Sequence, residues 1–211
     1  MRITEAAVRR RRLYLLRLDN DAEHTVDRQT FDESPYRVGA EITEEQLETL
    51  LTQSQYNRAR ERALYLLGLR DYACGELEKK LYTEATPEIA ASVVGRLREV
   101  GLLDDARYAV RLARHLSEYK QYPRRRIEQE LRHRGIDPAT VSDAVAALEG
   151  EDFEQALALL EKKYYNKLST PEDRRRVTAA LARRGFSYGA IRRAMDAQGS
   201  PDDEEIFTDG D

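Results

Sequence analysis

The sequence predicts a mainly α-helical protein, an elongated right-handed-type array of three tandem three-helix repeats with a small N-terminal β-hairpin and helix module. The first observation is an internal repeat: RRRIEQELRHRGID at 124–137 resembles RRRVTAALARRGFS at 174–187, at a constant offset of 50 positions. The second is that apolar residues recur three or four positions apart in each 50-residue unit. A fixed period of this length is typical of repeat proteins, in which each unit packs against its neighbours.

The N-terminal module, over residues 1–55, has a different pattern. Residues 8–18 are apolar and arginine-rich without a helical period, and a turn signal separates them from a possible returning strand at 24–26. This order predicts a short β-hairpin. Thr43 and Gln46 form a capping box, which predicts that a helix begins directly after Thr43.

Each repeat is expected to contain three helices. The second helix carries two apolar residues four positions apart, which places both on one face and in the core. Gly135 and Gly185 follow the second helices of the last two repeats, and a polar cap opens each third helix. The core pairs are Leu77 and Leu81, Ile127 and Leu131, and Val177 and Leu181; the caps are Thr86, Asp137 and Ser187. The repeats are expected over 56–105, 106–149 and 150–198, followed by a disordered acidic tail over 199–211.

Composition argues against several functional classes. Cys74 is the only cysteine, which excludes an intrachain disulfide, and the three histidines lie in separate segments without metal-ligand spacing. The sequence has no nucleotide-binding or nucleophile motif, no run of 18 apolar residues and no secretory signal. We therefore expect a cytoplasmic protein that is not an enzyme, with no catalytic residue, metal, cofactor, membrane contact or small-molecule substrate.

Charge is distributed unevenly along the chain. The net charge of −4 is the sum of −3 over residues 1–55, +3 over 56–148, +2 over 149–198 and −6 over 199–211. A mildly acidic chain does not coat DNA through bulk charge, but local basic surfaces remain possible.

Arginines on the second helices of the last two repeats are the main binding candidates. The eight candidates are Arg125, Arg126, Arg132, Arg174, Arg175, Arg176, Arg183 and Arg184. Residues seven apart share a helical face, so Arg125 aligns with Arg132 and Arg176 aligns with Arg183, away from the core side. The acids Glu128 and Glu130 stand four positions after Arg124 and Arg126, so a salt-bridged, solvated face is the alternative in the second repeat.

A second basic run lies near the N-terminus, and it consists of Arg9, Arg10, Arg11 and Arg12. On one strand, Arg10 and Arg12 would share one face and Arg9 and Arg11 the other. Such a run favours either a charged edge that prevents strand pairing between molecules or a contact with nucleic acid.

These features resemble the RecX family, the bacterial regulators of the RecA recombinase. The resemblance is carried by RALYLLGLRDYACGELEKKL at 62–81, VVGRLREVGLLDDARYA at 93–109 and RRIEQELRHRGI at 125–136. It covers roughly residues 56–198, and it departs at Tyr122-Pro123, where many members have a glycine. The resemblance implies tandem three-helix repeats and binding to RecA and its filament on single-stranded DNA. It also implies inhibition of strand exchange, ATPase and coprotease activities.

Three functions remain open. The first, which the resemblance implies, is regulation of RecA by capping the filament or lying in its groove, with possible direct DNA contact. The second is sequence-independent DNA binding without RecA, because arginine binds phosphate and carboxylate groups alike. The third is a helical adaptor for an unrelated protein, which would bind neither DNA nor RecA.

Overall fold

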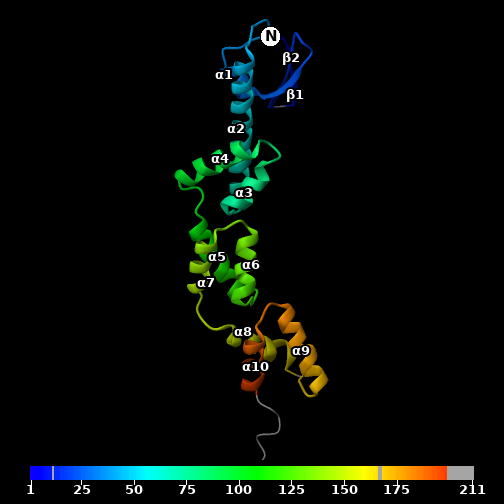
Figure 1. Ribbon diagram of the computed structural model, residues 1–211, viewed down its shortest axis with the longest axis vertical. Helices are drawn as coiled ribbons and strands as arrows, with labels where there is room; N and C mark the ends of the chain where they lie inside the picture. Colours follow the sequence, from blue (N-terminus) through cyan, green and yellow to red (C-terminus); the bar gives the residue numbers. More distant parts are fainter. Residues whose placement is uncertain (11, 166–167, 199–211) are drawn as a thin grey trace, which may run out of the picture. The chain divides into compact units, whose positions relative to one another are not determined.

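The computed structural model describes residues 1–10, 12–165 and 168–198, and the chain divides into two compact units, residues 1–104 and 105–211 (Figure 1). Most of the described chain is helical, with one small sheet near the N-terminus. The acidic tail expected over 199–211 lies outside the described residues. No described helix is both long enough and apolar enough to span a bilayer.

The N-terminal sheet has three antiparallel strands in the order β1 (Ile3–Arg10), β2 (Leu13–Leu18) and β3 (Glu23–Asp27). Strands β2 and β3 form the predicted hairpin. The prediction missed β1, and it was wrong to treat residues 8–18 as one strand, because a turn at Arg12 divides them. The weak apolar pattern of β1 explains the error: this edge strand buries Ile3 but leaves Val8 64% exposed.

Two helices pack with this sheet, α1 (Arg28–Glu33) and the first half of α2 (Glu44–Leu69). The capping box at Thr43 is confirmed. Helix α2 is continuous through the boundary expected at 55/56, and its two halves pack in different cores. Leu47 and Leu50 pack in the sheet core, whereas Ala59 and Ala63 pack in the core of the first repeat.

The first repeat consists of the second half of α2 with α3 (Cys74–Leu81) and α4 (Pro87–Glu99). Leu77 and Leu81 are fully buried against α4, as their spacing predicts. Cys74 opens α3 and packs, partly buried, against the same core.

The second unit holds the second and third repeats. The second repeat consists of α5 (Asp105–Glu118), α6 (Arg124–His133) and α7 (Pro138–Ala146). The third consists of α8 (Asp152–Leu159), which continues into the π-helical turn η1 (Leu160–Tyr164), then α9 (Pro171–Arg183) and α10 (Tyr188–Ala197).

The predicted repeat register is confirmed in the packing and in the helix ends. Ile127, Leu131, Val177 and Leu181 are all at most 4% exposed. Thr86, Asp137 and Ser187 each accept a hydrogen bond from the backbone three residues later. Gly135 and Gly185 have φ of +80° and +102°, which places them in the left-handed region that glycine adopts at helix C-termini.

Candidate functional site: an arginine pocket in the second unit

Arg124 has a structural role at the start of α6. Its guanidinium donates hydrogen bonds to the carbonyl oxygens of Val145 (3.0 Å) in the last turn of α7 and of Leu148 (2.8 Å) and Gly150 (2.8 Å) just after it. Carbonyls at a helix C-terminus lack partners within the helix and carry partial negative charge, so a cation is favourable there. This contact replaces the pair with Glu128 that the sequence suggested.

Arg126 lies two residues further along α6 and has a different environment. Its guanidinium carbon lies 3.8 Å from the centroid of the Tyr122 ring, a cation–π contact that holds the side chain in one direction. Tyr122 and the buried Pro123 are the two residues at which this sequence departs from the family that it resembles. One of them, Tyr122, therefore provides the aromatic ring that Arg126 contacts.

Two acids of α6 pair with arginines that follow them, which corrects the expected pairing. Glu128 bonds Arg132 at 3.3 Å and Glu130 bonds Arg134 at 2.8 Å. Partial burial of Arg134 opposes its charge, but the contacts with Glu130 and Tyr108 outweigh it and raise its pKa, so Arg134 stays charged. Arg126 is consequently not neutralised by Glu130, whereas Arg132 is partly neutralised by Glu128.

The α9 arginines divide into two groups. At the start of the helix, Arg174 donates its Nε–H to the carbonyl of Leu168 at 3.0 Å, and Arg176 lies 3.6 Å from Asp173. Arg175 is exposed beside them. At the other end of the helix, Arg183 is exposed and Arg184 is half-buried. Within the described chain, neither Arg183 nor Arg184 has an acidic partner.

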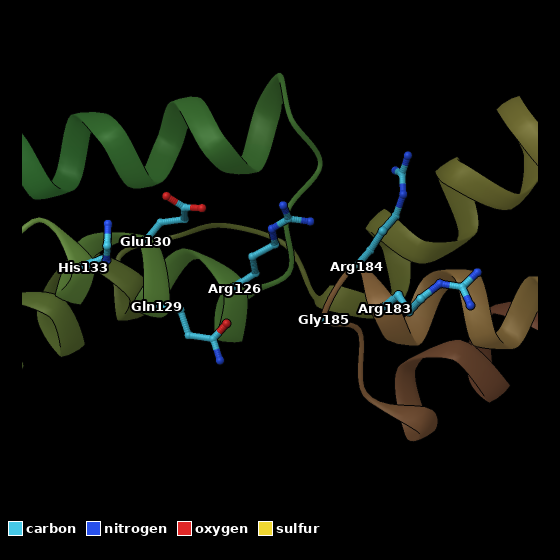
Figure 2. Close-up of a pocket in the computed structure, with 7 residues that line it drawn as sticks. All are labelled: Arg126, Gln129, Glu130, His133, Arg183, Arg184 and Gly185. Carbon is cyan, nitrogen blue, oxygen red and sulfur yellow. The ribbon is translucent and has the colours of Figure 1, made fainter.

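The structure brings three of the predicted arginines to one pocket. Arg126 of α6 and Arg183 and Arg184 at the end of α9 line a cavity of about 470 Å³. Figure 2 shows that the side chains of Arg126 and Arg184 extend to the same side of the ribbon in this view. We call this cavity the arginine pocket; it is lined by Arg126, Gln129, Glu130, His133, Arg183, Arg184 and Gly185.

Gly185 determines how closely the two repeats approach at the arginine pocket. A Cβ at this position would lie 3.3 Å from the Cβ of Arg126 and 3.4 Å from Cγ of Pro123. A side chain here would therefore push α6 away, in addition to the strain of a left-handed backbone. The glycine that ends α9 thus also allows contact with α6.

Sequence reasoning missed Gln129, Glu130 and His133 as lining residues. One available signal was the difference between repeats at equivalent positions: Glu130 corresponds to Ala180, and Arg134 corresponds to Arg184. Arg134 is paired because the second repeat has a carboxylate four residues earlier, whereas Arg184 follows an alanine at that spacing. The remaining candidates, Arg125, Arg132 and the first group on α9, are not among the lining residues of the arginine pocket.

The secondary candidates belong to the first unit, and two of them, Arg9 and Arg12, have local partners. Arg9 donates to the hydroxyl of Thr25 at 3.1 Å, and Arg12 bonds Glu61 of α2 at 2.6 Å. Arg10 ends β1, and Arg11 lies outside the described residues. Because Arg12 is in a turn, the expected alternation of four arginines on one strand is wrong.

Comparison with known proteins places these repeats in a family. The model described as the second three-helix domain of RecX matches residues 104–145, and the third three-helix domain matches residues 149–195. A regulatory protein RecX from Trichlorobacter lovleyi is 34% identical over 140 residues, which cover 64% of this chain and 91% of the relative. One from Xanthomonas axonopodis is 36% identical, with 64% and 83% covered.

The chain belongs to the RecX family. It is thus a member of a family of regulatory proteins. A crystal structure of a regulatory protein RecX is similar in fold, with a TM-score of 0.63, 24% identity and coverage of 92% of this chain and 98% of that one. The residues that line the arginine pocket belong to the segments that match the second and third three-helix domains of RecX.

Proposed function

We propose that this chain regulates RecA by binding RecA and its filament on single-stranded DNA. The bound protein inhibits the recombinase, ATPase and coprotease activities by capping the filament or by lying in its groove. Membership of the RecX family supports the RecA partner. The observation that carries a binding role for the second unit is the arginine pocket. There, Arg126 and two arginines at the end of α9, which have no acidic partner among the described residues, line one cavity.

The arginine pocket suits an anionic partner for physical reasons. Unlike lysine, arginine presents a planar fork of donors that binds phosphate or carboxylate oxygens in pairs. The Tyr122 ring holds Arg126 in place, so less side-chain entropy is lost when it binds. A nucleoprotein filament offers both kinds of anion, the DNA phosphates and the acidic side chains of the protein.

Inhibition by this mechanism is stoichiometric and needs no chemistry from the chain itself. A protein that occupies the groove or the end of a filament excludes the homologous duplex, the cleavage substrate or the next subunit. We therefore propose that the protein is not an enzyme and that its effect follows its occupancy on the filament. Its expected partners are RecA and single-stranded DNA, with no cofactor and no small-molecule substrate.

The primary test measures RecA ATP hydrolysis on single-stranded DNA while the protein is titrated. We expect the rate to fall as occupancy rises, together with the yield of strand exchange. An unchanged rate and yield over a wide range of ratios would refute the proposal.

A pair of double variants tests whether the arginine pocket carries the effect. Arg183→Gln with Arg184→Gln removes two charges at the pocket, and Arg175→Gln with Arg176→Gln removes two at the other end of the same helix. We expect the first pair to weaken inhibition about tenfold or more and the second pair to weaken it less. Equal losses would assign function to the whole face of α9 instead, and circular dichroism verifies that each variant is folded.

The alternative function is sequence-independent DNA binding without RecA, and it rests on the same arginines. A pull-down with RecA in the absence of DNA separates the two, because only the RecA-directed function predicts capture. If arginine pocket residues contact phosphate, each lost contact lowers the salt slope of binding to single-stranded DNA by about 0.7. If they contact RecA, the variants weaken capture of RecA while binding to naked DNA changes little.

A further inference from the structure

The arginine pocket is a basic site that the described part of the chain leaves unneutralised. Glu130, its one acidic lining residue, is engaged with Arg134 at 2.8 Å. Arg183 and Arg184 have no carboxylate partner among the described residues, and both lie at the end of α9. The side chain of Arg184 extends to the same side of the ribbon as that of Arg126, whereas the exposed side chain of Arg183 extends away from Arg126 in this view (Figure 2). Three arginines that line one cavity give it a positive charge, which favours an acidic occupant.

The chain carries a segment of matching charge. Residues 199–211 contain six Asp and Glu residues and no Lys or Arg, and four of the acids are consecutive at 202–205. This concentration of negative charge lies directly after the repeat that supplies Arg183 and Arg184. Along the sequence, the arginines Arg183 and Arg184 therefore precede α10, and the acidic residues of opposite charge follow it.

The length of chain after α10 fits the distance to be covered. Helix α10 has 10 residues, so it measures about 15 Å, and it begins three residues after Gly185 of the arginine pocket. Residues 202–205 follow Gln198, the C-cap of α10, by four to seven positions. At about 3.3 Å per extended residue, they can reach about 13–23 Å back from that cap. The acidic run is therefore within reach of the arginine pocket.

We infer that residues 202–205 dock in the arginine pocket of their own chain, where their carboxylates pair with Arg126, Arg183 and Arg184. An exposed ion pair contributes little alone, but tethering raises the local concentration of the segment to about 1 mM. Several weak contacts then suffice for substantial occupancy. If the proposed function holds, the segment competes with the anionic partner for the same arginines and lowers the affinity of the protein for it.

The experiment uses a fluorescent synthetic peptide of residues 199–211 and two full-length proteins. One is the intact chain, and the other carries Asp202→Asn, Asp203→Asn, Glu204→Gln and Glu205→Gln. If the free peptide binds the neutralised chain with a Kd of about 0.3 mM, a tethered competitor at about 1 mM weakens apparent binding to the intact chain about fourfold. We expect that difference in fluorescence anisotropy at low salt, and its loss at about 1 M salt, where the Debye length is about 3 Å.

Charge-matched variants of the neutralised chain locate the contact. Arg183→Gln with Arg184→Gln should weaken peptide binding at least fivefold, while Arg175→Gln with Arg176→Gln, which removes the same charge elsewhere on α9, should change it less than twofold. If the first pair disturbs folding, the single change at the exposed Arg183 should still weaken binding about twofold or more.

Two results would overturn this inference. Equal peptide binding by the intact and neutralised chains would mean that the tethered segment does not occupy the site. Equal losses in the two arginine pairs would mean that the attraction follows net charge and not the arginine pocket. RecA and DNA are absent from this assay, so its failure is distinct from a failure to inhibit RecA.

Discussion

Substitution of Arg124 by methionine should destabilise the second unit although the residue belongs to a run of arginines. Methionine retains an unbranched apolar stem but removes three hydrogen bonds, of 2.8 to 3.0 Å, to carbonyls at and just after the C-terminal end of α7. A hydrogen bond with a charged partner contributes about 1.5–3 kcal/mol. Because Arg124 is partly exposed and water can replace some of these bonds, we expect a total loss of about 2–4 kcal/mol.

The neighbouring residue provides the matched control. Arg125 is exposed, so Arg125→Met removes the same charge and should change stability by less than about 0.5 kcal/mol. Native-state hydrogen exchange at α6 and α7 amides measures the free energy of opening in each variant. Equal exchange in the Arg124 and Arg125 variants would refute the structural role of Arg124.

Three further perturbations test the repeat architecture. Leu131→Ala and Leu181→Ala should each cost about 2–5 kcal/mol in urea unfolding, because both side chains are fully buried; a negligible loss would contradict the 50-residue register. Gly185→Ala should cost about 1–2 kcal/mol or more, since φ is +102° and the new Cβ would lie 3.3 Å from an α6 side-chain carbon; an unchanged melting temperature would contradict this close approach. Hydrogen bonds from Thr140 lower the pKa of Asp137, so its contribution to stability should be present above the ordinary Asp range and lost as pH falls through the lowered value; Asp137→Asn should flatten this acid limb in thermal melts, and an unaltered limb would exclude it.

Local sequence determines the repeats because helical periodicity and capping act over a few residues. The Ile127 and Leu131 pair lies on one face of α6 whatever the rest of the chain does, and Asp137 caps α7 through a backbone N–H only three residues away. The same reasoning identified the arginine-rich helices and the glycines that end them. It failed at β1, since an edge strand that buries little apolar surface leaves a weak pattern.

The tertiary structure determines which contacts each arginine makes. Arg124 reaches carbonyls 21 to 26 positions away, and Arg126 meets Gly185 of the next repeat. No spacing rule within one helix contains these contacts, because they depend on how α6 packs against α7 and α9. The sequence by itself therefore determined the helices, their register and the set of basic candidates. Only the packing of the repeats selected Arg126, Arg183 and Arg184 for one pocket, since charges distant along the chain act together only when the fold brings them close.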